Sequence, residues 1–243
     1  MKSLKSLAFA IILSILVTTT VSAAEEVSFA TFPIPLMVVD ENNGVFVELA
    51  NAIASRADLK IKIIIAPPKR TITNFIGNKA DVLFPAVDVF FPPDYAYLKS
   101  SEPIYIKTDF IFTRKGDPLL KTIESLEGQK VGITRGYPYA NELMNNKKIV
   151  FDAANGDNFN VLKLMKGRIV AFVVEEKSGL KAFEEAGLLD KMQYDKASPV
   201  SKQDVFYSFQ TNEKGKRLEK LISRVLLEMK KDGSFGKIMA KAK

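Results

Sequence analysis

The chain of 243 residues contains no cysteine, no histidine and no tryptophan. Without cysteine the fold has no disulfide, although an exported protein could form one. Without histidine or cysteine, Ser-His-Asp triads, imidazole proton shuttles and most zinc sites are excluded. No carboxylates occur at EF-hand spacing, so we expect no metal and no cofactor. This shortage of catalytic groups favours a binding protein over an enzyme.

The positive charge of the chain is spread along it rather than gathered in one segment. Lysine and arginine number 35 against 28 acidic residues, which gives a formal net charge of +7. The densest basic stretch, 214–243, alternates lysine with leucine and isoleucine at helical spacing, as is typical of a solvated helix face. We therefore expect no nucleic-acid partner.

The first 24 residues have the order of a secretory signal peptide. A positive start, 1–5, precedes an apolar run, 7–17, and a tail of small residues ends at Ala24. We predict cleavage after Ala23 or Ala24 and export to the periplasm. The apolar run is shorter than the roughly 20 residues that span a bilayer, and an uncleaved membrane anchor is the alternative.

Strand and helix signals alternate along the remaining chain. Apolar alternation or continuous apolar runs predict strands at 27–31, 59–66, 81–87, 104–113, 130–134, 150–152, 169–174 and 205–209. Apolar residues at helical spacing predict helices at 46–57, 69–77, 136–144, 158–166, 178–186, 217–230 and 235–239. The isoleucines of 59–66 indicate a strand buried on both faces. This order predicts an α/β fold of two lobes, with right-handed βαβ units and mostly parallel sheets.

Five short motifs carry a resemblance to a known family. In order along the chain they are Gly44–Ala50, Gly77–Asp81, Ser100–Tyr105, Leu126–Gly132 and Lys231–Ile238. Together they resemble the bacterial extracellular solute-binding proteins of family 3, the periplasmic receptors of polar amino-acid ABC transporters. The resemblance implies a two-lobed type II periplasmic-binding fold, in which each lobe is a mostly parallel sheet flanked by helices and two crossover strands join the lobes.

The resemblance also implies how the chain is divided. The signal peptide is 1–24, the first lobe is 25–107 plus 206–243, and the second lobe is 108–205. A small ligand is expected in the cleft, with hinge closure of the lobes over it. The hinges are expected near Tyr105–Thr108 and Val205–Ser208. The expected partner is a membrane ABC permease, and the expected state is a monomer.

One segment departs from the family pattern. The amino-acid binders of the family carry a Thr-x-x-Arg stretch after the third strand, and its arginine clamps the ligand carboxylate. Here the corresponding segment, Val87–Asp94, contains no arginine. Either the carboxylate is recognised elsewhere, or the ligand is not a standard amino acid.

Two strand-to-helix turns supply candidate anion-binding residues. Arg70 follows the second predicted strand, at the sheet edge where α/β folds bind ligands, and a guanidinium can grip a carboxylate with two hydrogen bonds. Thr134, Arg135 and Tyr137 lie between a strand and a predicted helix, where outward N–H groups favour an anion. If the ligand carries a carboxylate, we expect its clamp to be Arg70 or Arg135. The alternative for each is an ordinary solvated or structural role.

The remaining candidates are acidic or aromatic. Glu175 ends a buried strand, and the resemblance implies that it receives an ammonium group of the ligand; Asp88 is a second candidate anion. Phe32 and Phe90 are candidates to stack on the ligand, and the resemblance places an aromatic wall at Phe32. The alternatives are a helix cap for Glu175 and core packing for the aromatic rings.

The preferred function is a periplasmic receptor that captures a small polar solute, carboxylated or amino-acid-like, for an ABC importer. One alternative is a periplasmic ligand sensor that docks on a membrane receptor. Another is a dehydratase-type enzyme on the same fold, which requires Glu175 or Asp88 to act as a general acid with a shifted pKa.

Overall fold

A computed structural model describes residues 26–242, and the predicted signal peptide lies outside this range. The strands are β1 (Glu26–Thr31), β2 (Lys60–Ile65), β3 (Val82–Ala86), β4 (Leu98–Lys99), β5 (Tyr105–Arg114), β6 (Lys130–Thr134), β7 (Val150–Ala154), β8 (Ala171–Glu175), β9 (Met192–Gln193) and β10 (Ser201–Phe209). The α-helices are α1 (Val45–Arg56), α2 (Pro68–Ile76), α3 (Asn141–Met144), α4 (Asp157–Met165), α5 (Glu176–Glu185), α6 (Glu213–Lys231) and α7 (Ser234–Met239). Within 26–242, no helix is both long and apolar enough to cross a bilayer.

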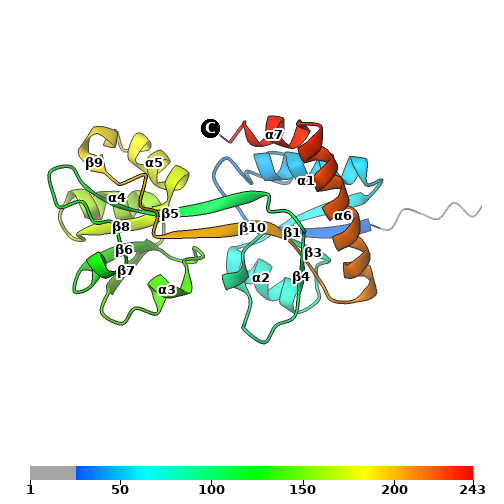
Figure 1. Cartoon of the computed structure of the whole chain (residues 1–243), viewed down its shortest axis with the longest axis horizontal. Coiled ribbons are helices and arrows are strands. Elements are labelled where there is room, and N and C mark those ends of the chain that lie inside the picture. The colour runs from blue at the N-terminus through cyan, green and yellow to red at the C-terminus, as the bar shows by residue number, and fades with distance from the viewer. Residues whose placement is uncertain (1–25, 243) are drawn as a thin grey trace, which may run out of the picture.

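The strands form a continuous path in the order β2-β1-β3-β10-β5-β8-β6-β7. In the first lobe β1 lies parallel between β2 and β3, and in the second β6 lies parallel between β7 and β8. β5 and β10 are antiparallel to their neighbours, and these two long strands connect the lobes (Figure 1). The predicted α/β fold of two lobes joined by two crossover strands is confirmed.

β10 changes its pairing partner part-way along. Its first half, Ser201–Val205, pairs with β5, and from Phe206 onward it pairs with β3. The expected hinge segments lie within β5 and β10. The lobe boundaries expected at 107/108 and 205/206 stay a prediction.

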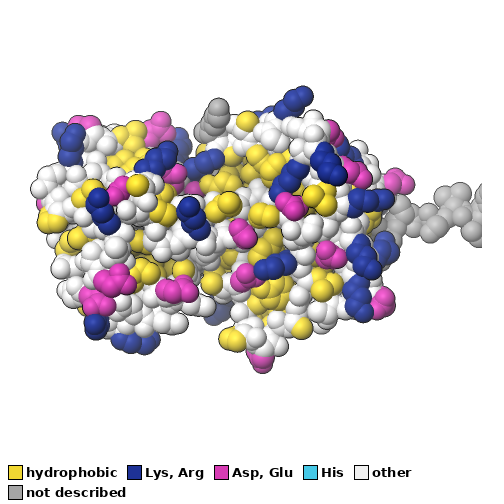
Figure 2. All heavy atoms as spheres, viewed as in Figure 1, with side chains coloured by type: hydrophobic (Ala, Val, Ile, Leu, Met, Phe, Trp, Pro, Cys, Tyr) yellow, Lys and Arg dark blue, Asp and Glu magenta, His cyan; other side chains and the backbone are white. Residues whose placement is uncertain are grey.

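Each lobe has its own apolar core on both faces of its sheet. In the first lobe α1, α6 and α7 cover one face and α2 the other; in the second, α4 and α5 lie opposite α3 (Figure 1). Fully buried residues in the four clusters include Leu49, Phe75, Phe183 and Val131. On the face in Figure 2, positive and negative side chains are interspersed, in agreement with the spread charge of the sequence.

Two of the predicted elements are wrong. A helix was expected from residue 136, but α3 begins only at Asn141. The hydroxyl of Tyr139 accepts the Thr134 N–H (2.8 Å) and donates to the Val173 carbonyl (3.0 Å), which holds the preceding turn against β8 in a non-helical path. β2 is also not buried on both faces: it is the edge strand, with its lysines exposed and its isoleucines half-buried.

Candidate ligand-binding site

A cavity of about 150 Å³ lies between the two lobes. It sits at the carboxyl ends of β1, β3, β6 and β8, where α/β sheets bind ligands. An apolar cavity of this volume accepts a molecule such as benzene, so there is room for one small solute. The lining residues are Phe32, Pro33, Ile34, Pro35, Leu36, Met37, Phe46, Pro68, Pro85, Val87, Phe90, Tyr105, Lys107, Gly136, Tyr137, Pro138, Glu175, Lys177, Ser178, Lys181, Val205 and Ala242.

The loop after β1 is fixed against the start of α1. The N–H groups of Val45 and Phe46 donate to the carbonyls of Leu36 (3.1 Å) and Met37 (2.9 Å). Gly44 makes this approach possible: its φ is 126°, and a Cβ at this position would lie 2.4 Å from the Met37 oxygen. The loop is therefore a built wall of the cavity, and the first N–H groups of α1 are already bonded.

The part of the first-lobe wall that residues 32–90 form is apolar. Phe32 and Phe90 meet edge to face, with ring centroids 5.9 Å apart and an interplanar angle of 79°. The wall also contains Pro33, Pro35, Pro68 and Pro85. None of the lining residues between positions 32 and 90 is charged. This half of the cavity suits an uncharged part of a ligand.

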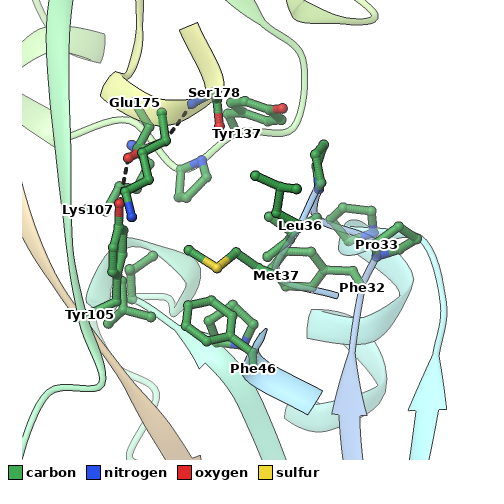
Figure 3. Close-up of a pocket in the computed structure, with 18 of the residues that line it drawn as sticks. Phe32, Pro33, Leu36, Met37, Phe46, Tyr105, Lys107, Tyr137, Glu175 and Ser178 are labelled. Carbon is green, nitrogen blue, oxygen red and sulfur yellow. Dashed lines mark hydrogen bonds between the residues drawn. The ribbon is translucent and has the colours of Figure 1, made fainter. Parts of the chain in front are cut away.

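Glu175 is the acidic group of the opposite wall (Figure 3). One carboxylate oxygen accepts the Tyr105 hydroxyl (2.7 Å), and the other accepts the Ser178 N–H (2.9 Å), where Glu175 caps α5. Burial, together with the charge of Glu175, raises the pKa of the Tyr105 hydroxyl, which therefore stays protonated and donates. The carboxylate is held in place and retains lone pairs for a ligand.

A second carboxylate stands behind Tyr137. The Tyr137 hydroxyl donates to Asp157 (3.2 Å), and the Thr134 hydroxyl donates to the other oxygen of Asp157. Burial raises the pKa of Asp157, and the negative charge of Glu175 acts in the same direction. Glu175 and Tyr137 therefore line the cavity from the second lobe, and Asp157 lies behind Tyr137.

Lys107 of β5 also lines the cavity, but its ammonium group already has a partner. It forms an ion pair with Asp109, whose side chain is 1% exposed, and Asp109 also accepts the Ser201 hydroxyl (2.7 Å). The Lys107 ammonium lies 5.4 Å from the centre of the Tyr139 ring. Asp109 therefore neutralises the charge of Lys107 next to the cavity.

The other cations of the wall lie on α5. Lys177 donates to the carbonyl of Ala242 (2.6 Å), which connects the second lobe to the C-terminal segment of the first. Lys181 pairs with Glu184 (3.0 Å) on its own helix. Both lysines line the cavity; Lys181 is paired with a carboxylate, whereas the partner of Lys177 is a neutral carbonyl, so Lys177 keeps its charge.

Four of the eight site residues expected from the sequence line this cavity. They are Phe32, Phe90, Tyr137 and Glu175, and they come from two loops, the 3-10 helix Asp88–Phe90 and the end of one strand. The two phenylalanines lie on the first-lobe wall and the other two on the second-lobe wall. Ligand contact by these residues stays a prediction.

The other four expected residues do not line the cavity. Arg70 is exposed on α2, and Asp88 is bonded to Tyr97 and to Lys99 of β4. Thr134 is buried beneath the turn after β6, and Arg135 is exposed and donates to Asn155 (3.1 Å). In this arrangement neither arginine faces the ligand space, and a role for them in ligand binding stays a prediction.

Two N–H groups of the turn after β6 are bonded within the protein. The N–H of Arg135 donates to the Ala154 carbonyl (2.8 Å), and that of Tyr137 donates to the Thr134 carbonyl (3.2 Å). Pro138 has no N–H group. Gly136 of the same turn lines the cavity, and the anion-site prediction for this turn stays a prediction.

Several lining residues were not expected from the sequence, among them Tyr105, Lys107, Met37 and Phe46. One signal was available: Lys107 and Asp109 interrupt the apolar run of β5 at a spacing of two, which places both on the same face of a strand. Within residues 26–242, there is no group of three or more acidic side chains that could hold a metal.

Comparisons with known proteins agree with the fold. The model of the bacterial extracellular solute-binding proteins, family 3, matches residues 27–242. The putative amino-acid ABC transporter-binding protein PatH of Vibrio harveyi is 25% identical over 227 residues, which cover 91% of this chain and 90% of PatH.

Two solved structures share the fold at lower identity. The GluR0 ligand-binding core from Nostoc punctiforme, in complex with L-glutamate, has a TM-score of 0.73 at 21% identity and covers 88% of this chain and 98% of its own. A histidine kinase sensor domain with similarity to periplasmic binding proteins has a TM-score of 0.72 at 20% identity and covers 90% of this chain and 96% of its own.

Proposed function

Because the chain belongs to the bacterial extracellular solute-binding proteins of family 3, we propose that it captures a small, amino-acid-like solute in the cavity between its lobes. The observation that carries this proposal is the position of Glu175. Its carboxylate is fixed by Tyr105 and Ser178 at the interlobe cavity, where it can accept an ammonium group. Charge-assisted hydrogen bonds of this kind are about twice as strong as neutral ones.

Closure of the lobes completes the site in this proposal. Phe32 and Phe90 lie on one wall, and Glu175 and Tyr137 lie on the other. We keep the lobe boundaries at 107/108 and 205/206, because β10 exchanges β5 for β3 between Val205 and Phe206. Bending at these points brings the two walls onto the ligand.

The biological setting follows from the proposed binding role. The chain would act in the periplasm, after loss of residues 1–24, as a monomer that delivers its ligand to a membrane ABC permease. The amino-acid assignment of the relative PatH supports an amine-bearing solute. Binding requires no covalent step, and the chain has no histidine for acid–base catalysis. The sensor role uses the same closure, and a permease gene or a sensor-kinase gene beside this one would distinguish the two.

The test begins with mature protein that has been unfolded and refolded to remove bound solute. It is screened by thermal shift against amino acids, polyamines, small carboxylates and sugars. A ligand at a hundred times its dissociation constant stabilises the fold by about 2.7 kcal/mol, which for a chain of this size raises the Tm by about 5–11 °C.

Glu175→Gln then tests the site itself. The substitution keeps an acceptor for Tyr105 but removes the charge, so affinity for an amine ligand should fall by about 10- to 150-fold. Glu176→Gln is the matched control, because Glu176 is bonded to Tyr194 (2.7 Å) and lies outside the cavity lining. Equal affinities of wild type and Glu175→Gln in calorimetry would remove Glu175 from the site.

A further inference from the structure

The C-terminal segment after α7 is fixed on the first lobe. Ala242 is 1% exposed and belongs to the larger core cluster of that lobe. Its N–H donates to the Met239 carbonyl (3.2 Å), and the preceding Lys241 forms an ion pair with Glu48 of α1 (2.5 Å). Residues 240–242 therefore follow a defined path, which holds the Ala242 carbonyl in one position.

This segment also reaches the second lobe. In Figure 1 the chain after α7 leads toward α5. There the Ala242 carbonyl accepts a hydrogen bond from the Lys177 ammonium (2.6 Å), and both residues line the cavity between the lobes. Neither residue belongs to β5 or β10, the two strands that connect the lobes. The hydrogen bond is therefore a separate link between the lobes, located at the ligand cavity.

Lys177 is well placed to hold this link. A hydrogen bond from an ammonium group is charge-assisted and stronger than one between neutral groups. The ammonium also lies 5.6 Å from the centre of the Tyr105 ring, within the distance of about 6 Å at which a ring attracts a cation. The Tyr105 hydroxyl in turn donates to Glu175 (2.7 Å). Lys177 therefore contacts the same tyrosine that fixes Glu175, so a movement of α5 shifts the link and the ligand site together.

Lys181, on the same helix, has a different kind of partner. It lies one turn further along α5 and also lines the cavity, but it pairs with Glu184 of its own helix (3.0 Å). That pair lies within the second lobe and places no restraint on the first. The partner of Lys177 is instead the backbone of the other lobe. A comparison of the two lysines therefore separates the link from the effect of a positive charge at the cavity.

We propose that Lys177 and residues 240–242 form a strap that holds the two lobes near the arrangement of this structure before a solute binds. Lys177 is a positioning residue in this inference, because it sets the spacing of the lobes at the cavity. The inference goes beyond the proposed function: it concerns the hinge motion of the lobes and not the chemistry of the solute. Without the strap, fewer contacts oppose bending of β5 and β10, and the equilibrium shifts toward lobes that stand further apart.

Distances between two spin labels test the strap directly. The chain has no cysteine, so Glu41→Cys and Ala186→Cys place one label on each lobe, both at exposed positions. Pulsed electron–electron double resonance on ligand-stripped mature protein then gives the distribution of distances between the lobes. In Lys177→Met the ratio of separated to strapped lobes should rise about three- to tenfold, the upper value being equivalent to about 1.4 kcal/mol.

Four further variants, each carrying the same two labels, identify the cause of a shift. Lys177→Arg keeps a charged donor and should keep the wild-type distribution, and so should Lys181→Met. A chain that ends at Ala240 lacks the acceptor and should shift as Lys177→Met does. Combining this shortening with Lys177→Met should do no more than either change alone, because both break the same bond. Glu48→Gln breaks only the exposed pair with Lys241, controls for the loss of that residue, and should leave the distances unchanged.

Three results would overturn the inference. The first is a Lys177→Met distribution equal to that of wild type, and the second is an equal shift in Lys181→Met. The third is a shift in the shortened chain without one in Lys177→Met, which would locate the restraint in the tail alone. The distances are measured without a solute, so a direct contact of Lys177 with a solute would not change them. Failure of the strap would therefore leave the proposed function standing, and Glu175→Gln tests that function separately.

Discussion

Lys107→Met tests whether the charge of Lys107 is committed to Asp109 rather than available to a ligand. The two side chains are 11% and 1% exposed, and β5 holds both on one face. The substitution leaves the Asp109 carboxylate buried with the Ser201 hydroxyl as its remaining side-chain donor. Breaking a buried ion pair from one side destabilises proteins by about 3–5 kcal/mol.

For a chain of this size, that loss corresponds to a fall in Tm of about 6–20 °C in calorimetric unfolding. Lys60→Met is the control, because the Lys60–Glu26 pair is 67% and 48% exposed and should contribute at most about 1 kcal/mol. The double variant Lys107→Met with Asp109→Asn should recover much of the stability, since it removes the unpaired charge. A Lys107→Met protein as stable as Lys60→Met would refute the buried-pair reasoning.

Two further predictions concern the cavity walls. Phe32→Ala should weaken binding of an amine ligand by about 10- to 150-fold in calorimetry, because buried apolar area is lost. Phe159→Ala is the control and should leave affinity unchanged, because Phe159 is 54% exposed and lies outside the lining. Equal effects of the two substitutions would contradict the apolar-wall assignment. Burial raises the pKa of Asp157 above its ordinary 3.8, so the stability that this group contributes is fully present below pH 3.8 and is lost as the pH rises through the raised value. In thermal unfolding from pH 3 upward, the stability of wild type relative to Asp157→Asn should therefore decline with pH, and a difference that grows with pH would contradict the direction of the shift.

The order of the elements was predictable because each has a local signal. The helical stripe of α6, with Leu218, Ile222 and Leu226 buried, is readable as period 3.6, and the apolar run of β8 is readable as a buried strand. The short motifs then indicated the family, and the family resemblance implied how these helices and strands are joined into two lobes. The sequence could not show that β2 lies at a sheet edge, since that depends on which strand pairs beside it.

The site was half predictable for a related reason. Glu175 and Tyr137 follow strands whose carboxyl ends meet at the cavity, so their position follows from topology. Arg70 follows a strand as well, yet its side chain is exposed, because the direction of a helical side chain depends on where the helix packs. The position of the first-lobe wall depends on the contact of the 32–37 loop with α1, and no local sequence pattern predicts this contact.

The central claim is that the cavity between the lobes holds an amine at Glu175. The most direct test is a crystal structure of the ligand-stripped mature protein with the tightest-binding amine of the screen. The account predicts an amino nitrogen about 2.7–3.2 Å from the Glu175 carboxylate, with the ligand body against Phe32 and Phe90 and both lobes in contact with it. A ligand bound outside this cavity, or one with its amine against the first-lobe wall, would contradict the account.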